Sequence, residues 1–142
     1  MIPTGEVAAV DGTPFDLRQA RRIGDGLGQG EQQQFGSGYD HCFVLHAAAA
    51  RGELAAAELT STDGRLALRL FTDYPGLQIC SGNFVQNSHG RDGQPFARHA
   101  GIALEPQFFP DAPNHPVWRE QGCVIRPGQS LSRWMRLEFN AR

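Results

Sequence analysis

The amino-acid sequence predicts an all-β protein, an antiparallel β-sandwich of short strands. Its 142 residues include 17 glycines and 9 prolines, and these residues favour turns because glycine supplies positive φ angles and proline presets φ. Several segments between the turns alternate apolar and polar side chains with the two-residue period of a half-buried strand. The hydrophobic content of 40% is enough for one core, so we expect a single domain over residues 1–142.

The first 46 residues predict two strands separated by loops. The apolar stretch Val7–Val10 lies between turn residues and predicts a strand that opens a hairpin. Residues 15–23 are compatible with one or two helical turns, and the glycines that follow predict a loop over residues 24–38. Residues 39–46 are rich in β-branched and aromatic side chains and predict a strand with Asp40 at its start.

The middle of the chain predicts a hairpin and a short strand. Residues 47–59 are rich in alanine, yet Gly52 lies among them and argues against a helix. Asp63-Gly64 is a turn signal between residues 54–59 and the alternating segment 65–72, so we expect these two segments to pair. Residues 77–80 predict a further strand, and residues 86–99 an exposed loop.

The C-terminal part predicts two strands around a rigid loop. In the segment 102–105, Ile102 and Leu104 share one face of a strand and Glu105 points to the other. Three prolines between residues 108 and 116 exclude a helix there. Residues 131–139 alternate again and predict a long final strand, which gives seven to nine strands in total.

Composition excludes several classes of function. Thirteen basic against fifteen acidic residues give a net charge of −2, which argues against a nucleic-acid partner. The N-terminus has no basic and apolar leader, and no apolar run reaches membrane-spanning length, so we expect a soluble protein without a membrane partner. Three separated cysteines without a CxxC motif predict reduced thiols in the cytoplasm.

Three polar residues lie between apolar neighbours on the predicted strands, namely Asp40, Gln78 and Glu105. A carboxylate beside Phe108 and Phe109 is expected to be partly desolvated, and desolvation improves a carboxylate as a proton acceptor. The pattern alone is more typical of a solvent-facing glutamate on a half-exposed strand, because such alternation is the norm in antiparallel sheets.

Other chemistries find less support. The five histidines lack the spacing of a metal site, and the sequence has no Gly-x-Ser-x-Gly motif of a serine hydrolase. Phe43, Phe84 and Trp134 are interpreted as core residues rather than as sugar platforms. Residue patterns thus reach a β-sandwich with a ligand surface, and no reaction.

Six segments together span nearly the whole chain, namely Ile2–Gly5, Gly12–Asp16, Gly38–Phe43, Pro75–Phe84, Gly101–Pro116 and Arg126–Gly128. Their residues, order and spacing resemble the aldose 1-epimerase (galactose mutarotase) family. The resemblance implies part of a large β-supersandwich that interconverts the α and β anomers of free aldohexoses such as galactose and glucose, without a cofactor. It also implies that Glu105 takes the proton from the anomeric hydroxyl, while Asp40 and Gln78 hold sugar hydroxyls.

The sequence departs from the family in length and in one motif. Family members are roughly twice this long, and their N-terminal part carries the acid histidine in a His-Pro-Tyr/Phe motif that this sequence lacks. The resemblance therefore implies the C-terminal part of a single domain and an incomplete catalyst, with none of the five histidines in the acid's role. A second departure is Ile79-Cys80, where the family has an aromatic pair.

Three alternatives stay open at this point. The chain could bind carbohydrate without turning it over, or it could belong to an epimerase of hexose 6-phosphates whose phosphate-binding residues lie outside it. It could also be a remnant that self-associates through exposed sheet edges, because half a sandwich leaves apolar faces and strand edges uncovered.

Overall fold

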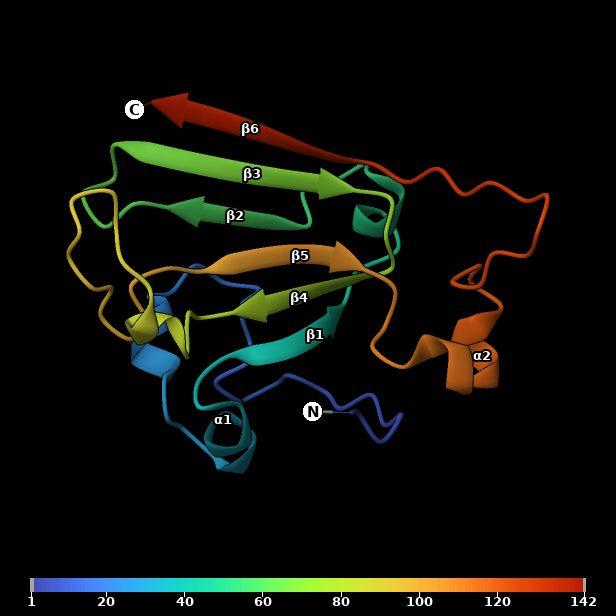
Figure 1. The fold of residues 1–142 in the computed structure, drawn as a ribbon, viewed down its shortest axis with the longest axis horizontal. Helices are drawn as coiled ribbons and strands as arrows, with labels where there is room; N and C mark the ends of the chain where they lie inside the picture. The colour runs from blue at the N-terminus through green and yellow to red at the C-terminus, as the bar shows by residue number, and fades with distance from the viewer. Residues whose placement is uncertain (1, 142) are drawn as a thin grey trace. The chain divides into compact units, whose positions relative to one another are not determined.

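A computed structural model describes residues 2–141, and the all-β, antiparallel fold class predicted from the sequence is confirmed. Six strands lie in two three-stranded sheets, one with the order β1-β4-β5 and one with the order β2-β3-β6 (Figure 1). The helices of the described chain are short, and none of them is long and apolar enough to cross a membrane.

The chain forms two compact units. The first unit contains residues 3–41 and 78–105, and the second contains residues 42–77 and 106–141. The boundaries between the units fall within three strands, which are β1 (Asp40–Val44), β4 (Gly76–Cys80) and β5 (Ala103–Gln107).

The N-terminal part of the first unit differs from its prediction. Residues 7–10, predicted as a strand, run as irregular backbone, and Val7 is 62% exposed. Residues 24–38, predicted as a loop, contain most of the 3₁₀ helix η1 (Ile23–Gly26) and the helix α1 (Glu31–Gly36). Glutamate and glutamine are good helix formers, and this helix ends where Ser37 adopts a left-handed φ of 57°.

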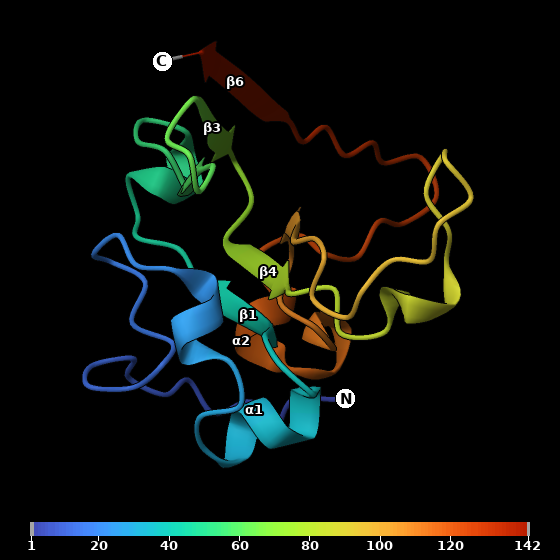
Figure 2. The same cartoon turned by 90° about the vertical axis from the view of Figure 1, so that its left-hand side faces the viewer.

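Helix α1 leads directly into β1 through a tight turn, which Figure 2 shows from the side. Gly38 has a φ of 136°, and a Cβ atom there would lie 2.4 Å from Asn83 Oδ1. A side chain at this position would therefore clash, and only glycine fits the turn. After β4, the first unit continues through the 3₁₀ helix η3 (Val85–Asn87) and a largely exposed loop, as predicted for residues 86–99.

The second unit contains the predicted hairpin. Strands β2 (Ala57–Thr60) and β3 (Leu66–Thr72) pair antiparallel, with Leu59 opposite Leu68, and β3 lies between β2 and β6 (Figure 1). The turn follows the Asp63-Gly64 signal, because Gly64 has a φ of 72° and can adopt it without strain. The alanine-rich segment before β2 contains only the 3₁₀ helix η2 (Ala49–Arg51).

The last strand, β6 (Met135–Ala141), pairs antiparallel with β3 and starts four residues later than predicted. Its alternation is confirmed, because Leu137 lies opposite the buried Leu70 and Glu138 lies opposite Arg69. The interpretation of Trp134 as a core residue is wrong, since it is 43% exposed. Its ring covers Gly52, where an added Cβ atom would lie 2.3 Å from it.

Two further predictions are corrected in the same way. The interpretation of Phe84 as a core residue is wrong, because it is 66% exposed. Residues 108–116, predicted as a loop without helix, contain the 3₁₀ helix η4 (Ala112–Asn114), and α2 (Pro116–Arg119) begins at their end. Proline is tolerated in a first helical turn because its missing N–H would have no helical partner there.

Candidate functional site

The three predicted site residues lie on three adjacent strands of one sheet. Asp40 is the first residue of β1, Gln78 is the middle residue of β4, and Glu105 is the middle residue of β5. Strand β4 lies between the other two, and all three residues belong to the first unit. Residues that are up to 65 positions apart in sequence are thus gathered on neighbouring strands.

Asp40 and Gln78 are joined directly. The Gln78 side-chain amide Nε2 donates a hydrogen bond of 2.8 Å to Asp40 Oδ1, and both residues are half-buried. Gln78 Oε1 is buried and has no hydrogen-bond partner among the described residues. Unsatisfied buried acceptors are uncommon in folded proteins, and functional sites are one place where they occur.

Glu105 is exposed, and it makes no hydrogen bond or ion pair with any described residue. The expectation that this carboxylate is partly desolvated is therefore wrong for the described chain. The reason lies in the alternation of β5, because Leu104 points to the covered face and Glu105 to the uncovered one. Phe109, one of the two aromatic residues expected beside Glu105, is itself buried.

A buried polar network holds the start of β1 in place. The Tyr39 N–H donates to Ser81 Oγ at 3.0 Å, and the Ser81 N–H donates to the Tyr39 carbonyl at 3.0 Å. Asn83 Nδ2 donates to the carbonyls of Gly36 and Tyr39 at 2.7 and 2.9 Å. Because Tyr39 directly precedes Asp40, these bonds fix Asp40 relative to the segment that follows Gln78.

The remaining polar groups of this network are satisfied as well. Ser81 Oγ donates to Asn83 Oδ1 at 2.7 Å, and a ring nitrogen of His99 lies 2.9 Å from the Ser81 carbonyl oxygen. Ser81 and Asn83 are only 2% and 1% exposed. A fully satisfied buried network rigidifies the backbone around it.

The histidine next to Asp40 reinforces this arrangement. His41 Nδ1 accepts a hydrogen bond of 3.0 Å from the Asp40 N–H, so this nitrogen carries no proton. Burial lowers the pKa of His41 from its ordinary value, although the charge of Asp40 opposes the shift. His41 is thus kept neutral, which preserves its bond to the backbone of Asp40.

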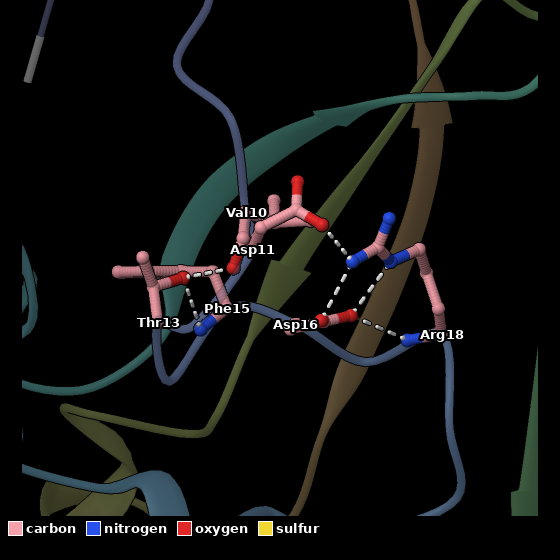
Figure 3. Close-up of polar contacts among 6 residues, drawn as sticks. All are labelled: Val10, Asp11, Thr13, Phe15, Asp16 and Arg18. Atoms are coloured by element: carbon pink, nitrogen blue, oxygen red, sulfur yellow. Dashed lines mark hydrogen bonds and ion pairs between the residues drawn. The ribbon is translucent and has the colours of Figure 1, made fainter.

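A turn near the N-terminus places the Phe15 ring beside the two residues that flank Asp40. Thr13 Oγ1 donates to the Val10 carbonyl at 2.6 Å and accepts from the Phe15 N–H at 3.1 Å, while Arg18 binds both carboxylate oxygens of Asp16 (Figure 3). The Arg18 guanidinium holds the pKa of Asp16 at about 2.

The turn presents Phe15 to the two residues that flank Asp40. The Phe15 ring lies 5.6 Å from the ring of Tyr39 and 4.6 Å from that of His41, in edge-on geometries. The Tyr39 hydroxyl donates to the Pro14 carbonyl at 2.6 Å. Burial raises the pKa of Tyr39, so the hydroxyl stays protonated and remains a donor.

Sequence reasoning missed the roles of Tyr39, Ser81 and Asn83. The turn-like segment that contains Ser81 and Asn83 indicates by itself only the end of a strand. A usable signal is nevertheless present, because small polar residues directly after an apolar strand often bond to a neighbouring backbone.

A surface depression of the first unit lies away from these residues. It has a volume of about 450 Å³ and does not include any of the three predicted site residues. Its walls come from the N-terminal turn and from residues on either side of η1, namely Gly12, Thr13, Pro14, Asp16, Gln19, Ala20, Arg21 and Gln29. The hydrogen-bonded pair of Asp40 and Gln78 is therefore separate from this depression.

Comparison with known proteins connects these residues to a family. The family model for aldose 1-epimerase matches residues 1–138. The chain is 39% identical over 140 residues to the aldose 1-epimerase of Escherichia coli K12, which covers 99% of this chain and 40% of that protein. It is 36% identical over 141 residues to human galactose mutarotase, which covers 99% of this chain and 39% of that protein.

The fold is also found among solved structures. A crystal structure of an aldose epimerase homologue from C. elegans superimposes with a TM-score of 0.78 at 22% identity, over 99% of this chain and 40% of that one. The chain therefore spans about two fifths of the length of the relatives that it matches.

Proposed function

The chain belongs to the aldose 1-epimerase family, and we propose that its first unit binds a free aldohexose and removes a proton during interconversion of the α and β anomers. The observation that carries the proposal is the bond of 2.8 Å between Gln78 and Asp40. It holds an amide and a carboxylate side by side, and these are the groups that position sugar hydroxyls in a site.

The proposed roles follow from the free groups of each side chain. Asp40 Oδ1 is engaged by Gln78, so Oδ2 is the oxygen that accepts a hydrogen bond from a sugar hydroxyl. Glu105 is exposed, and in our proposal it accepts the proton of the anomeric hydroxyl. Transfer of this proton lets the bond between the anomeric carbon and the ring oxygen break, provided that an acid protonates the ring oxygen.

The proposal assigns that acid to no residue of this chain. In the resemblance described above the acid is a histidine of a His-Pro-Tyr/Phe motif, and the 142 residues contain no such motif. Without an acid, full negative charge develops on the ring oxygen as the bond breaks, and the rate falls by a factor of about 10² to 10⁴. We therefore propose that the 142 residues are part of one epimerase domain and catalyse weakly alone.

Two measurements on the 142-residue chain test the proposal. Calorimetric titration with D-galactose should show binding that Gln78→Ala and Asp40→Asn weaken. Polarimetry of freshly dissolved α-D-galactose should show little acceleration over buffer. The proposal for the first unit is wrong if galactose and glucose both fail to bind, or if the two variants bind as tightly as the parent chain.

A second candidate function is sugar binding without catalysis. The observation in its favour is that Asp40 and Gln78 are held together while Glu105 contacts no described polar group that would orient it. The Glu105→Gln variant separates the two candidates. Loss of the residual rate with unchanged galactose affinity supports the base, and a rate equal to buffer in both chains supports a binding module.

We also propose a cytoplasmic location. Cys42, Cys80 and Cys123 are free thiols in the structure, and free thiols persist in reducing compartments. Cell fractionation with an antibody against the chain would test this, and recovery of the chain with fully oxidised thiols from an extracytoplasmic fraction would contradict it.

A further inference from the structure

The edge strand β6 carries a row of apolar side chains that the described chain leaves exposed. Met135, Leu137 and Phe139 alternate along it and are 58%, 42% and 74% exposed. Because opposite residues of an antiparallel pair share a face, this row continues the face that carries Leu66 and Leu70 of β3. An edge strand with a contiguous exposed apolar row is a surface for pairing with another strand.

The backbone of β6 is arranged for such pairing. The Asp73 N–H donates to the Trp134 carbonyl at 3.4 Å, which turns the backbone groups of Trp134 toward β3. Backbone direction alternates along an antiparallel strand. The N–H and C=O groups of Met135, Leu137 and Phe139 therefore point to the edge of the sheet, on the same residues that carry the apolar row.

We propose that β6 pairs with β6 of a second copy of this chain, antiparallel and about a two-fold axis at Leu137. In this arrangement Leu137 lies opposite Leu137 of the second copy, and Met135 lies opposite Phe139 of the second copy. Two-fold symmetry repeats each contact, so the apolar row of one chain meets itself. The β2-β3-β6 sheets of the two copies then form one continuous sheet of six strands.

Charges on the other face of β6 select this register. With the axis at Leu137, Arg136 lies opposite Glu138 of the second copy, and symmetry forms this pair twice. Moving the axis to Glu138 places two glutamates opposite each other, and moving it to Arg136 places two arginines opposite each other. Like charges directly opposite in a sheet are unfavourable. An axis between two residues would instead join the apolar face to the polar one.

Both charged groups are partly exposed and keep their contacts to β3 in this arrangement. Arg136 and Glu138 form an ion pair of 3.1 Å within one strand, and their side chains are 58% and 37% exposed. Glu138 also lies 3.5 Å from Arg69 Nη1, and the Arg136 guanidinium lies 4.4 Å from the centroid of the Phe71 ring. Exposed pairs contribute little to stability, so replacing the pair within a strand by two pairs between strands costs little. The apolar row then supplies affinity, and the charges supply the register.

The experiment uses the 142-residue chain and two single variants, Arg136→Glu and Glu138→Arg. Sedimentation equilibrium from about 1 μM to about 1 mM should show a monomer–dimer equilibrium for the parent chain. Each variant alone places like charges opposite each other twice, so its dimerisation should weaken about tenfold or more. In an equimolar mixture, both charged pairs across the axis join a glutamate of one variant to an arginine of the other. The mixture should therefore recover parent-like affinity.

Matched controls separate the proposal from misfolding. Arg91→Glu makes the same change of charge in an exposed loop and should dimerise like the parent chain. Circular dichroism establishes that both variants are folded, and recovery on mixing cannot arise from a folding defect. The proposal is overturned by a parent chain that stays monomeric, by variants that dimerise normally, or by a mixture that does not recover.

One added arm identifies the other occupant of this surface. A monomeric parent chain that instead binds the unmatched three fifths of the Escherichia coli relative would assign β6 to that segment and overturn pairing with a second copy. None of these outcomes depends on sugar binding, so the proposal stands or fails independently of the proposed function.

Discussion

Replacing Asn83 by alanine should loosen the start of β1 and weaken sugar binding through Asp40. The Asn83 side chain takes part in three hydrogen bonds, to Gly36, Tyr39 and Ser81, and it is 1% exposed. At about 1 kcal/mol net for each bond, the variant should lose about 3 kcal/mol of stability in the first unit. This loss corresponds to an increase of about 10²-fold in local opening.

Amide hydrogen exchange measures this opening where it is expected. The Tyr39 and Ser81 N–H groups bond across the network, so their exchange should accelerate by about that factor in Asn83→Ala. Asn87→Ala is the matched control, because Asn87 is exposed in the neighbouring η3. The control should stay within about 0.5 kcal/mol of the parent chain.

Exchange of these two amides in Asn83→Ala at the rate seen in the Asn87→Ala control would show that the Asn83 hydrogen bonds do not hold the start of β1 in place. Equal urea midpoints for the two variants would lead to the same conclusion. The positioning role has a separate readout in the galactose affinity measured on folded Asn83→Ala. Unchanged affinity despite faster exchange would show that the network stabilises the fold without positioning Asp40.

Three further predictions follow from burial and packing. As the pH falls below 6.5 and through the lowered pKa of His41, protonation of the ring should break its hydrogen bond to the Asp40 N–H and reduce stability. NMR titration should show one shared midpoint below 6.5 for the His41 ring and the Asp40 amide, and a midpoint above 6.5 would contradict this. Burial raises the pKa of Cys42 to about 11, so the rate of its alkylation should be low at pH 8 and rise toward pH 11. Peptide mass spectrometry measures this rate, and fast labelling of Cys42 at pH 8 would contradict the burial argument. Gly76→Ala should lower the free energy of unfolding in urea by about 1–3 kcal/mol, because the new Cβ atom would lie 2.9 Å from Cys42 Sγ. Gly24→Ala is the control, since a Cβ atom there meets open space and stability should hardly change. Equal losses of stability in the two variants would contradict the packing argument.

Strands with strong local signals were predictable from the sequence. The hairpin β2-β3 combines a turn glycine with strict alternation, and β6 alternates over its whole length. Both signals lie within a few residues of each other, so neither depends on distant parts of the chain. The helix α1 was missed because the neighbouring glycines outweighed four consecutive good helix formers at residues 31–34.

The candidate site was predictable in its residues and not in its connections. Alternation and family resemblance led to Asp40, Gln78 and Glu105, but the bond between Asp40 and Gln78 joins residues 38 positions apart. No local pattern encodes which strands become neighbours. The exposure of Glu105 and of Trp134 was predicted wrongly for a similar reason, because it depends on what covers their side of the sheet.

The long separation within the polar network also sets an order of events during synthesis. Tyr39 leaves the ribosome 42 residues before Ser81, its hydrogen-bond partner. At about 5–20 residues per second, this delay lasts about 2–8 s. During that interval the nascent segment around Asp40 has been synthesised while its hydrogen-bond partners at Ser81 and Asn83 have not.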